Sequence, residues 1–127
     1  MSSDTFSISK TIHGSIPRLR FEETKNYVLG KDFELSLVFI GSHLSRKLNR
    51  EYRKIDKETT ILTFPLSENE GEIFINPHKA RREAKLRRMN GNTFILYLFI
   101  HGLLHLKGMQ HSDTMEKEEE RICKKFS

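Results

Sequence analysis

The pattern of apolar and polar positions predicts alternating strands and helices in the first third of the chain. Apolar residues alternate with polar ones over residues 5–12, which is typical of a half-buried strand. A looser apolar spacing after Ser15 and Pro17 predicts a helix that stops at Gly30. Strict alternation returns over residues 33–40 and predicts a second strand, buried on both faces near its end.

The middle of the chain predicts a helix followed by two paired strands. Apolar side chains recur at every fourth position over residues 43–53, as on one face of a helix. Residues 59–65 are rich in β-branched and aromatic side chains, so we expect a strand that Pro65 closes. A polar turn ending at Gly71 separates it from a short strand over 72–75, and the two strands should form a hairpin.

Three helices are expected in roughly the last 50 residues, and a capping residue marks the start of each one. Asn76 caps a helix over 77–89. Asn92 starts a central helix over 93–106 that is apolar nearly all round and therefore buried. Ser112 caps the last helix, whose acidic residues precede its basic ones, in the order that the helix dipole favours.

The order of elements, βαβαββααα, predicts an α+β fold. We expect residues 1–127 to form a single domain, in which a small mixed sheet of about four strands packs with about five helices. Apolar residues make up 36% of the chain and charged residues 31%, values that suit a globular protein rather than a disordered one.

Cysteine usage and hydropathy indicate where the chain resides. Cys123 is the only cysteine, which excludes an internal disulfide, favours a reducing compartment and predicts no disulfide-linked partner. The residues after Met1 show no secretory signal. The longest apolar run, 94–100, is far shorter than the roughly 20 residues that span a bilayer. We therefore expect a cytoplasmic protein with no membrane partner.

Three histidines near the end of the predicted central helix indicate a metal centre. His101 and His105 are four residues apart, so they share one helix face and can direct both imidazoles at one point. Gly108 can end the helix in a left-handed turn that brings His111 back toward them. Three neutral imidazoles with an open fourth position form the arrangement of a catalytic zinc, so we expect one Zn²⁺ per chain.

The charge distribution points to a polyanionic substrate. Lys and Arg number 22 against 17 Asp and Glu, a formal charge of +5, which favours nucleic acid. Cations gather over 46–57 and above all over 77–89, where they can hold phosphates. Zinc proteases of the His-Glu-x-x-His kind need a Glu after the first His, and Gly102 stands there instead. Hydrolysis of RNA or DNA is therefore the better hypothesis, although the general base is not identified.

Four motifs together resemble the YbeY endoribonuclease family, the rRNA maturation factors. The stretch 101–111 is similar to the family signature HGxLHLxGxDH. Residues 48–53 resemble LNxxYR, residues 59–65 resemble TDVLSFP, and residues 71–73 resemble GDI. The resemblance runs in the right order from about residue 35 to about residue 122.

The resemblance implies an α+β fold and a zinc ion held by His101, His105 and His111. It implies single-strand-specific RNA cleavage in rRNA maturation and ribosome quality control, with RNA and the small ribosomal subunit as partners. Arg53 matches the family's functional arginine, and a guanidinium suits the task of holding the scissile phosphate.

Three positions differ from the family pattern. Gln110 and Thr60 stand where the family has Asp, and Glu72 replaces the Asp of GDI. Gln110 can accept a hydrogen bond but brings no charge, and partners of this kind change metal affinity by about 10–100-fold. These differences leave metal binding as the firmer expectation and catalysis as the weaker one.

Two other hypotheses remain open at the level of sequence. One is an RNA- or ribosome-binding assembly factor with a structural zinc, in which Cys123 completes a Cys-His₃ site. A cysteine on a terminal helix is more often a small buried hydrophobe, which weakens this hypothesis. The other is a metalloprotease with an unusual base.

Overall fold

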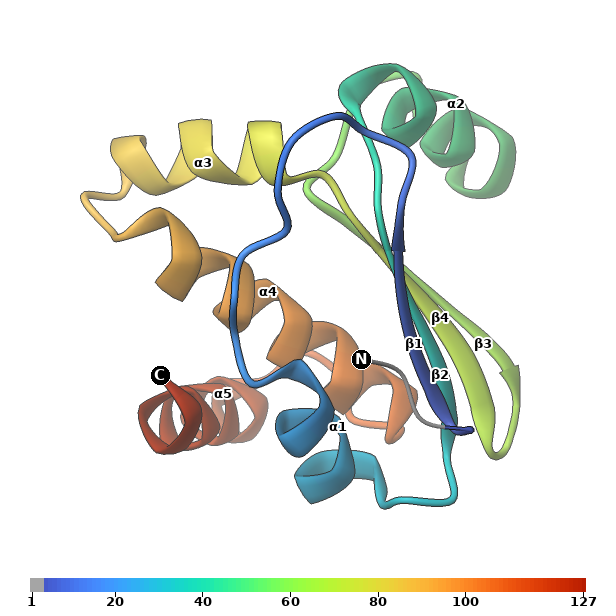
Figure 1. Cartoon of the computed structure of the whole chain (residues 1–127), viewed down its shortest axis with the longest axis vertical. Coiled ribbons are helices and arrows are strands. Elements are labelled where there is room, and N and C mark those ends of the chain that lie inside the picture. Colours follow the sequence, from blue (N-terminus) through green and yellow to red (C-terminus); the bar gives the residue numbers. More distant parts are fainter. Residues whose placement is uncertain (1–3) are drawn as a thin grey trace.

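The computed structural model describes residues 4–127 (Figure 1). Its elements follow the predicted order and give four strands and five helices, so the α+β fold is confirmed. They are β1 (Phe6–Lys10), α1 (Phe21–Leu29), β2 (Glu34–Phe39), α2 (Ser42–Arg53), β3 (Ile61–Ser67), β4 (Glu70–Ile75), α3 (Pro77–Leu86), α4 (Gly91–Leu106) and α5 (Asp113–Phe126).

The strands form one mixed sheet in the order β1-β2-β4-β3. The pairs β1–β2 and β2–β4 are parallel, with Phe6 opposite Leu35 and Leu37 opposite Ile73. Strand β3 pairs antiparallel with β4 at the edge of the sheet, which confirms the predicted hairpin. The parallel strands β2 and β4 are joined through α2 and β3.

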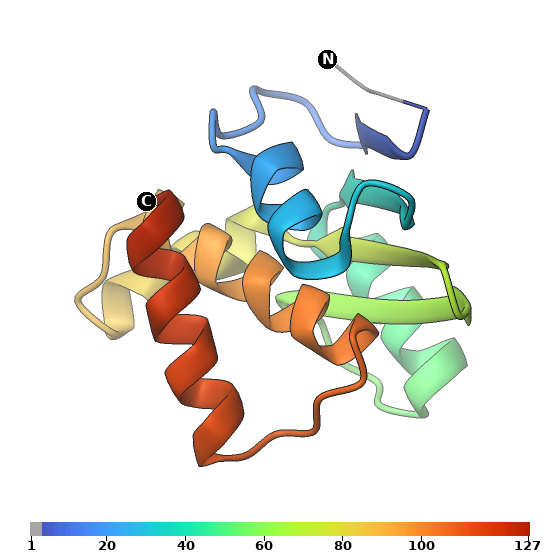
Figure 2. The same cartoon turned by 90° about the horizontal axis from the view of Figure 1, so that it is seen from below.

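Helix α4 forms the centre of the core on one face of the sheet. Nine of its residues are buried, from Phe94 to Leu104. It lies close to the sheet at Gly102, where a Cβ atom would be only 3.0 Å from Cδ1 of Ile73. Helices α1, α3 and α5 pack around α4 on the same side of the sheet (Figures 1 and 2).

Helix α2 covers part of the opposite face of the sheet (Figure 1). Tyr52 of α2 packs edge-on against Phe64 with ring centroids 5.2 Å apart, and Phe64 packs against Phe74 at 5.7 Å. Successive side chains of a strand point to opposite faces, so Phe74 faces α2 whereas its neighbours Ile73 and Ile75 face α4.

The N-terminal helix begins later than expected. Helix α1 starts at Phe21, not near Ser15, and ends as predicted at Gly30, which has φ +91°. The residue before a proline disfavours helical backbone, and Ile16, before Pro17, lies outside any helix. Ile16 and Leu19 still pack against the core, so this segment covers apolar surface without being helical.

Strand β3 is longer than expected, because it continues through Pro65 to Ser67. Proline cannot donate a hydrogen bond, but an edge strand leaves one side of its backbone unpaired and tolerates it. The register shifts between Pro65 and Ser67, which marks the irregularity that the proline imposes. The prediction that Pro65 closes the strand was therefore wrong.

The boundaries of the C-terminal helices follow their caps closely. Helix α4 begins two residues before the expected position, because Asn90 rather than Asn92 accepts the backbone N–H bonds of the first turn, at 2.9 and 3.2 Å. Helix α3 ends at Leu86, three residues before the predicted end, since Arg88 adopts a left-handed conformation with φ +57°. The Oγ atom of Ser112 accepts from the backbone of Met115 at 3.2 Å, which confirms the predicted cap of α5. No helix within residues 4–127 is long and apolar enough to cross a membrane.

Candidate metal centre

The exposed side of α4 is a single stripe that carries two of the predicted ligands. Thr93, Tyr97, His101 and His105 follow one another at four-residue intervals; the first three are partly exposed and His105 is exposed, and the residues between them are buried. The rings of His101 and His105 are 4.4 Å apart between centroids, and their Nε2 atoms are 2.9 Å apart. The i, i+4 spacing has therefore brought the two imidazoles together edge-on, at 85° between their planes, with their Nε2 atoms adjacent.

The other ring nitrogen of each histidine determines what these Nε2 atoms offer. Nδ1 of His101 lies 3.1 Å from Oε2 of Glu119, and Nδ1 of His105 lies 3.2 Å from the carbonyl oxygen of Met109. A carbonyl and an ionised carboxylate can only accept, so both Nδ1 atoms carry a proton. In the neutral rings both Nε2 atoms then present lone pairs to each other. Two facing lone pairs repel unless a proton or a metal ion lies between them, so this arrangement suits a cation.

Glu119 holds His101 from the neighbouring helix. Its side chain is 1% exposed, and its second oxygen, Oε1, has no hydrogen-bond partner among the described residues. Burial and, next, the charge of Glu119 raise the pKa of Tyr97, which lies one turn before His101. A buried carboxylate with one unpaired oxygen is costly without a nearby positive charge. A metal ion bound through His101 would supply that charge.

A glycine turn holds the second histidine. Gly108 has φ +104°, a conformation that residues with a Cβ rarely adopt, and its N–H donates to the carbonyl of His105 at 3.0 Å. The N–H of Met109 donates to the carbonyl of Leu104 at 3.0 Å, which leaves its own carbonyl aimed at the His105 ring. Burial, followed by repulsion from a protonated His101, lowers the pKa of His105, which favours the neutral, ligating form of its ring.

His111 lies near this pair without joining it. Its ring centroid is 6.3 Å from that of His101, and its Nε2 atom is 3.5 Å from Oε1 of Glu116. The side chain is 69% exposed. Across residues 4–127, no three His, Cys, Asp or Glu side chains converge as a metal-binding group. The three-histidine site therefore stays a prediction, of which the structure assembles His101 and His105.

The donor geometry fits a metal after a small adjustment. Two ligand nitrogens on a tetrahedral zinc, each about 2.0–2.1 Å from the ion, lie about 3.3 Å apart. The two Nε2 atoms are 2.9 Å apart, so the rings must separate by a few tenths of an ångström. Both rings are partly exposed, and rotation about their side-chain bonds allows this movement.

Gly102 faces the sheet and not the candidate site. A Cβ atom there would be 3.0 Å from Cδ1 of Ile73, 3.1 Å from Oγ1 of Thr63 and 3.2 Å from Cδ1 of Ile61. A glutamate at this position would point into the packed interface between α4 and the sheet. Close packing against the sheet therefore disfavours a glutamate at position 102, where a His-Glu-x-x-His protease carries its general base.

Arg53 lies at the C-terminal end of α2, which covers the sheet face opposite α4. It lines a hollow of about 280 Å³ together with Thr60 and with Lys79 and Glu83 of α3. No hydrogen bond or ion pair joins Arg53 to a histidine anywhere in the described part of the chain. The role of Arg53 in catalysis thus stays a prediction.

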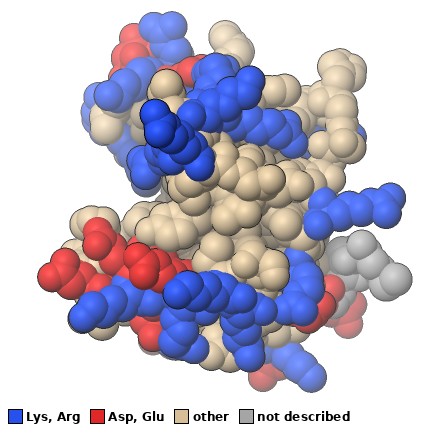
Figure 3. All heavy atoms as spheres, turned by 90° about the vertical axis from the view of Figure 1, so that its left-hand side faces the viewer, with Lys and Arg blue, Asp and Glu red and all other residues tan. Residues whose placement is uncertain are grey.

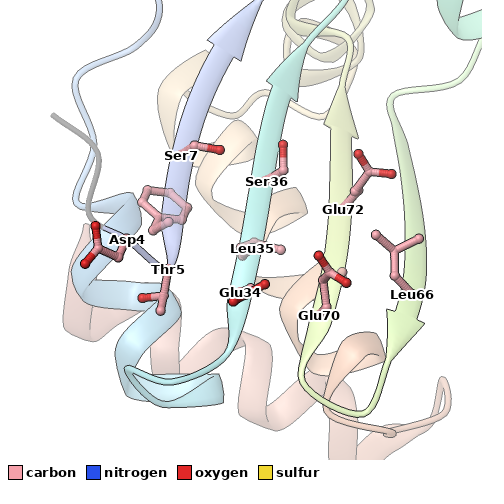
Figure 4. Close-up of a pocket in the computed structure, with 11 residues that line it drawn as sticks. Asp4, Thr5, Ser7, Glu34, Leu35, Ser36, Leu66, Glu70 and Glu72 are labelled. Carbon is pink, nitrogen blue, oxygen red and sulfur yellow. The ribbon is translucent and has the colours of Figure 1, made fainter.

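The other positions that differ from the family pattern are spread over the molecule. Gln110 is exposed in the turn before His111, and Thr60 lines the hollow beside Arg53. Glu72 lies on the outer face of the sheet in a hollow of about 230 Å³ (Figure 4). That hollow also holds Glu34 and Glu70, so it is acidic and unsuited to phosphate.

Cys123 does not reach the histidines. It lies one turn after Glu119 on α5, and burial raises the pKa of its thiol. It lines a hollow with Thr93 and Tyr97, at the other end of the exposed stripe of α4. The hypothesis of a Cys-His₃ site gains no support from this placement.

Glu119 is the site residue that sequence reasoning missed. It belongs to an acidic run that complements the dipole of α5, so the charge pattern offered no separate reason to assign Glu119 to the site. The buried residues of α5 are Met115, Glu119, Ile122 and Phe126, which follow a helical period. A charged residue on an otherwise apolar stripe was the available signal.

The fold is that of a small α+β protein with a mixed sheet of four strands. Its candidate metal centre consists of two imidazoles at the end of a buried helix, each held by a hydrogen bond to its Nδ1 atom. The family model described as Endoribonuclease YbeY matches residues 2–127. The chain belongs to the endoribonuclease YbeY family, and the predicted family is confirmed. Endoribonucleases are hydrolases, which agrees with the predicted class of enzyme.

Named relatives support the same family. "Endoribonuclease YbeY" of Mycoplasmopsis synoviae is 36% identical over 105 residues, which cover 75% of this chain and 68% of the relative. That of Wolinella succinogenes is 37% identical over 99 residues, covering 72% and 71%. That of Caldicellulosiruptor saccharolyticus is 30% identical and covers 94% and 82%. The solution structure of TM1509 from Thermotoga maritima has the same fold, with a TM-score of 0.68 at 24% identity over 93% of this chain and 86% of that one.

Proposed function

We propose that this chain is a metal-dependent endoribonuclease that hydrolyses single-stranded RNA in rRNA maturation and ribosome quality control. The observation that carries the proposal is the pair of Nε2 atoms of His101 and His105, 2.9 Å apart, in a member of a family named for endoribonuclease activity. The opposing lone pairs, fixed by Glu119 and by Met109, favour a cation between them.

We further propose one Zn²⁺ per chain as the metal, held by His101, His105 and His111. Such an ion, when bound, supplies Lewis-acid charge and a water of lowered pKa. Glu119 orients His101, and the Met109 carbonyl orients His105, so that each ring offers its Nε2 atom. The turn at Gly108 leaves His111 on an exposed loop from which its ring can approach the pair.

The remaining roles concern the substrate. Cations of α3 and Arg53 of α2 would hold phosphates of the strand, each contact weakening with salt. Part of this cationic surface is already neutralised, because Lys79 pairs with Glu83 at 2.8 Å and Arg82 pairs with Glu58. Arg53 has no acidic partner among the described residues and is therefore available for a phosphate.

We place the protein in the cytoplasm with RNA and the small ribosomal subunit as partners. Support comes from the single free cysteine, which suits a reducing compartment, and from the formal charge of +5, which suits polyanions.

A cleavage assay with single-stranded RNA tests the proposal. Wild-type protein should cut the RNA, and excess chelator should abolish cutting until Zn²⁺ is added back. His105→Ala should lose both the metal and the cleavage, whereas His13→Ala, a surface histidine before α1, should retain both. Cleavage that survives His105→Ala would refute the metal-dependent mechanism.

A further inference from the structure

A groove outside the histidine pair lies at the other end of the exposed stripe of α4. It has a volume of about 440 Å³ and lies between the end of α3, the first turns of α4 and the end of α5. Thr93 and Tyr97 supply its floor from α4, and Cys123 supplies its wall from α5. Tyr97 is four residues before His101, so this edge of the groove is about 6 Å along the helix axis from the first of the two histidines.

The groove offers flat surfaces of the kind on which nucleobases stack. Tyr97 is partly exposed in its lining. The guanidinium of Arg87 lies 5.2 Å from the ring centroid of Phe94, which is buried and holds the arginine in place. Bases that leave a stack are bound by aromatic rings and by arginine planes. Both kinds of surface are present in this one groove.

Cations flank the groove on two sides. Arg87 lies at the end of α3 and Lys124 near the end of α5, and both line it. Glu120 is the acidic residue of the lining. In Figure 3, Lys and Arg gather above and below an uncharged band on this side of the molecule, and Asp and Glu border the band at the lower left. An uncharged floor between two cationic edges suits a base with its flanking phosphates.

We propose that this groove is a nucleobase subsite that binds an unpaired base of single-stranded RNA beside the phosphodiester presented to the His101–His105 pair. The proposal rests on the proposed function and adds to it a place on the protein for the substrate. A base-paired nucleotide keeps both faces stacked in the duplex, so it cannot enter the groove. The subsite therefore supplies a physical reason for a preference for single strands.

Filling the groove tests the proposal through binding alone. Thr93→Trp adds a bulky side chain to its floor, and Asn92→Trp adds the same bulk at the exposed neighbouring position outside it. Affinity for a labelled single-stranded oligonucleotide is measured at equilibrium, on ice, and the oligonucleotide is confirmed to be intact afterwards. Thr93→Trp should weaken binding by about tenfold, as expected for the loss of one stacked base. Asn92→Trp should bind as the wild type does.

The cations give a second pair of matched variants. Lys124→Ala should weaken RNA binding and lower the slope of log affinity against log salt by about one contact. Lys125→Ala removes the next lysine of α5, which does not line the groove, and should leave the slope unchanged.

Cys123 reports occupancy of the groove directly, since it is the chain's only cysteine. Saturating single-stranded RNA should slow its alkylation by iodoacetamide, and a duplex of the same sequence should not. Equal protection by the duplex would overturn the assignment to an unpaired base. Unchanged binding by Thr93→Trp together with an unprotected Cys123, in protein that still cleaves RNA, would overturn the subsite alone. Wild-type protein that neither binds nor cleaves RNA would overturn the subsite and the proposed function together.

Discussion

The carboxylate of Glu119 lies 3.1 Å from Nδ1 of His101, so a buried anion on α5 fixes the ring of a candidate ligand on α4. This contact ties the site to the packing of two helices. The acceptor forces the Nδ1 proton onto His101 and frees its Nε2 atom for a metal. Oε1 of the same carboxylate is buried without a partner among the described residues. The buried charge of Glu119 therefore costs the most free energy of folding when no cation is bound nearby.

Glu119→Gln should therefore weaken the metal site without weakening the fold. The amide oxygen can still accept from His101, but the charge that supports the bound cation is gone. We expect metal affinity to fall by about 10–100-fold, measured by competition with a chelating dye. The melting temperature of the metal-free protein should stay the same or rise, because a buried charge with one unpaired oxygen has been removed.

Glu118→Gln is the matched control, since Glu118 is on the same helix but pairs with Arg121 at 2.8 Å. It should leave metal affinity unchanged. Full metal affinity in Glu119→Gln would show that the carboxylate does not support the site.

Removal of the metal should lower thermal stability. A ligand that binds only the native state stabilises it by about 2.7 kcal/mol when its concentration is 100 times the dissociation constant. Excess chelator should therefore lower the melting temperature of wild-type protein by several degrees. The same treatment of His105→Ala should cause no shift, because one of the two facing imidazoles is absent. A chelator shift of equal size in both proteins would place the stabilising metal elsewhere.

His111→Ala tests whether the third histidine completes the site. Its side chain is 69% exposed, so its loss should change the free energy of unfolding of metal-free protein by less than about 0.5 kcal/mol. Metal affinity should nevertheless fall by tenfold or more, because one of three predicted bonds is lost. Isothermal titration with Zn²⁺ measures this change. Unaltered affinity would remove His111 from the set of ligands and leave a two-histidine site.

Arg53→Ala should separate metal binding from RNA cleavage. Arg53 makes no hydrogen bond or ion pair to a histidine within the described residues, so zinc content should stay at the wild-type level. Cleavage of single-stranded RNA should fall strongly, because a phosphate contact is lost. Lys47→Ala, another exposed cation of α2, is the control and should cleave normally. Loss of zinc in Arg53→Ala would contradict the assigned role.

Features that depend on neighbours along the chain were predictable from the sequence. The caps at Asn76 and Ser112 and the facing pair His101 and His105 follow from helical spacing, and each lies where it was expected. The turn at Gly108 follows from the freedom of glycine at positive φ.

Features that depend on packing between distant segments were not predictable. From the sequence, Glu119 is expected to be a surface acid, and only the packing of α5 against α4 shows that it is buried. Pro65 reads as the end of a strand until β3 is known to be an edge, where a missing donor is tolerated. The hollow that Arg53 shares with Lys79 and Glu83 likewise depends on how α2 and α3 meet at the sheet, which no local pattern encodes.

Gly102→Ala tests whether the close approach of α4 to the sheet requires a glycine. Alanine favours a helix over glycine by about 1 kcal/mol. The added methyl group, however, would be 3.0 Å from Ile73 and 3.1 Å from Thr63, and such overpacking costs about 1–3 kcal/mol. We expect a net loss of up to about 2 kcal/mol in the free energy of unfolding, measured with urea. Gly91→Ala meets only an ordinary contact with Arg81 at 3.4 Å and should be neutral or stabilising.

Gly102→Glu, which introduces the residue that a His-Glu-x-x-His protease needs, should be far more disruptive than Gly102→Ala, because its charge would enter the buried interface beside Ile73. A stable Gly102→Glu protein would show that the helix can move away from the sheet, and that packing does not keep protease chemistry out of this site.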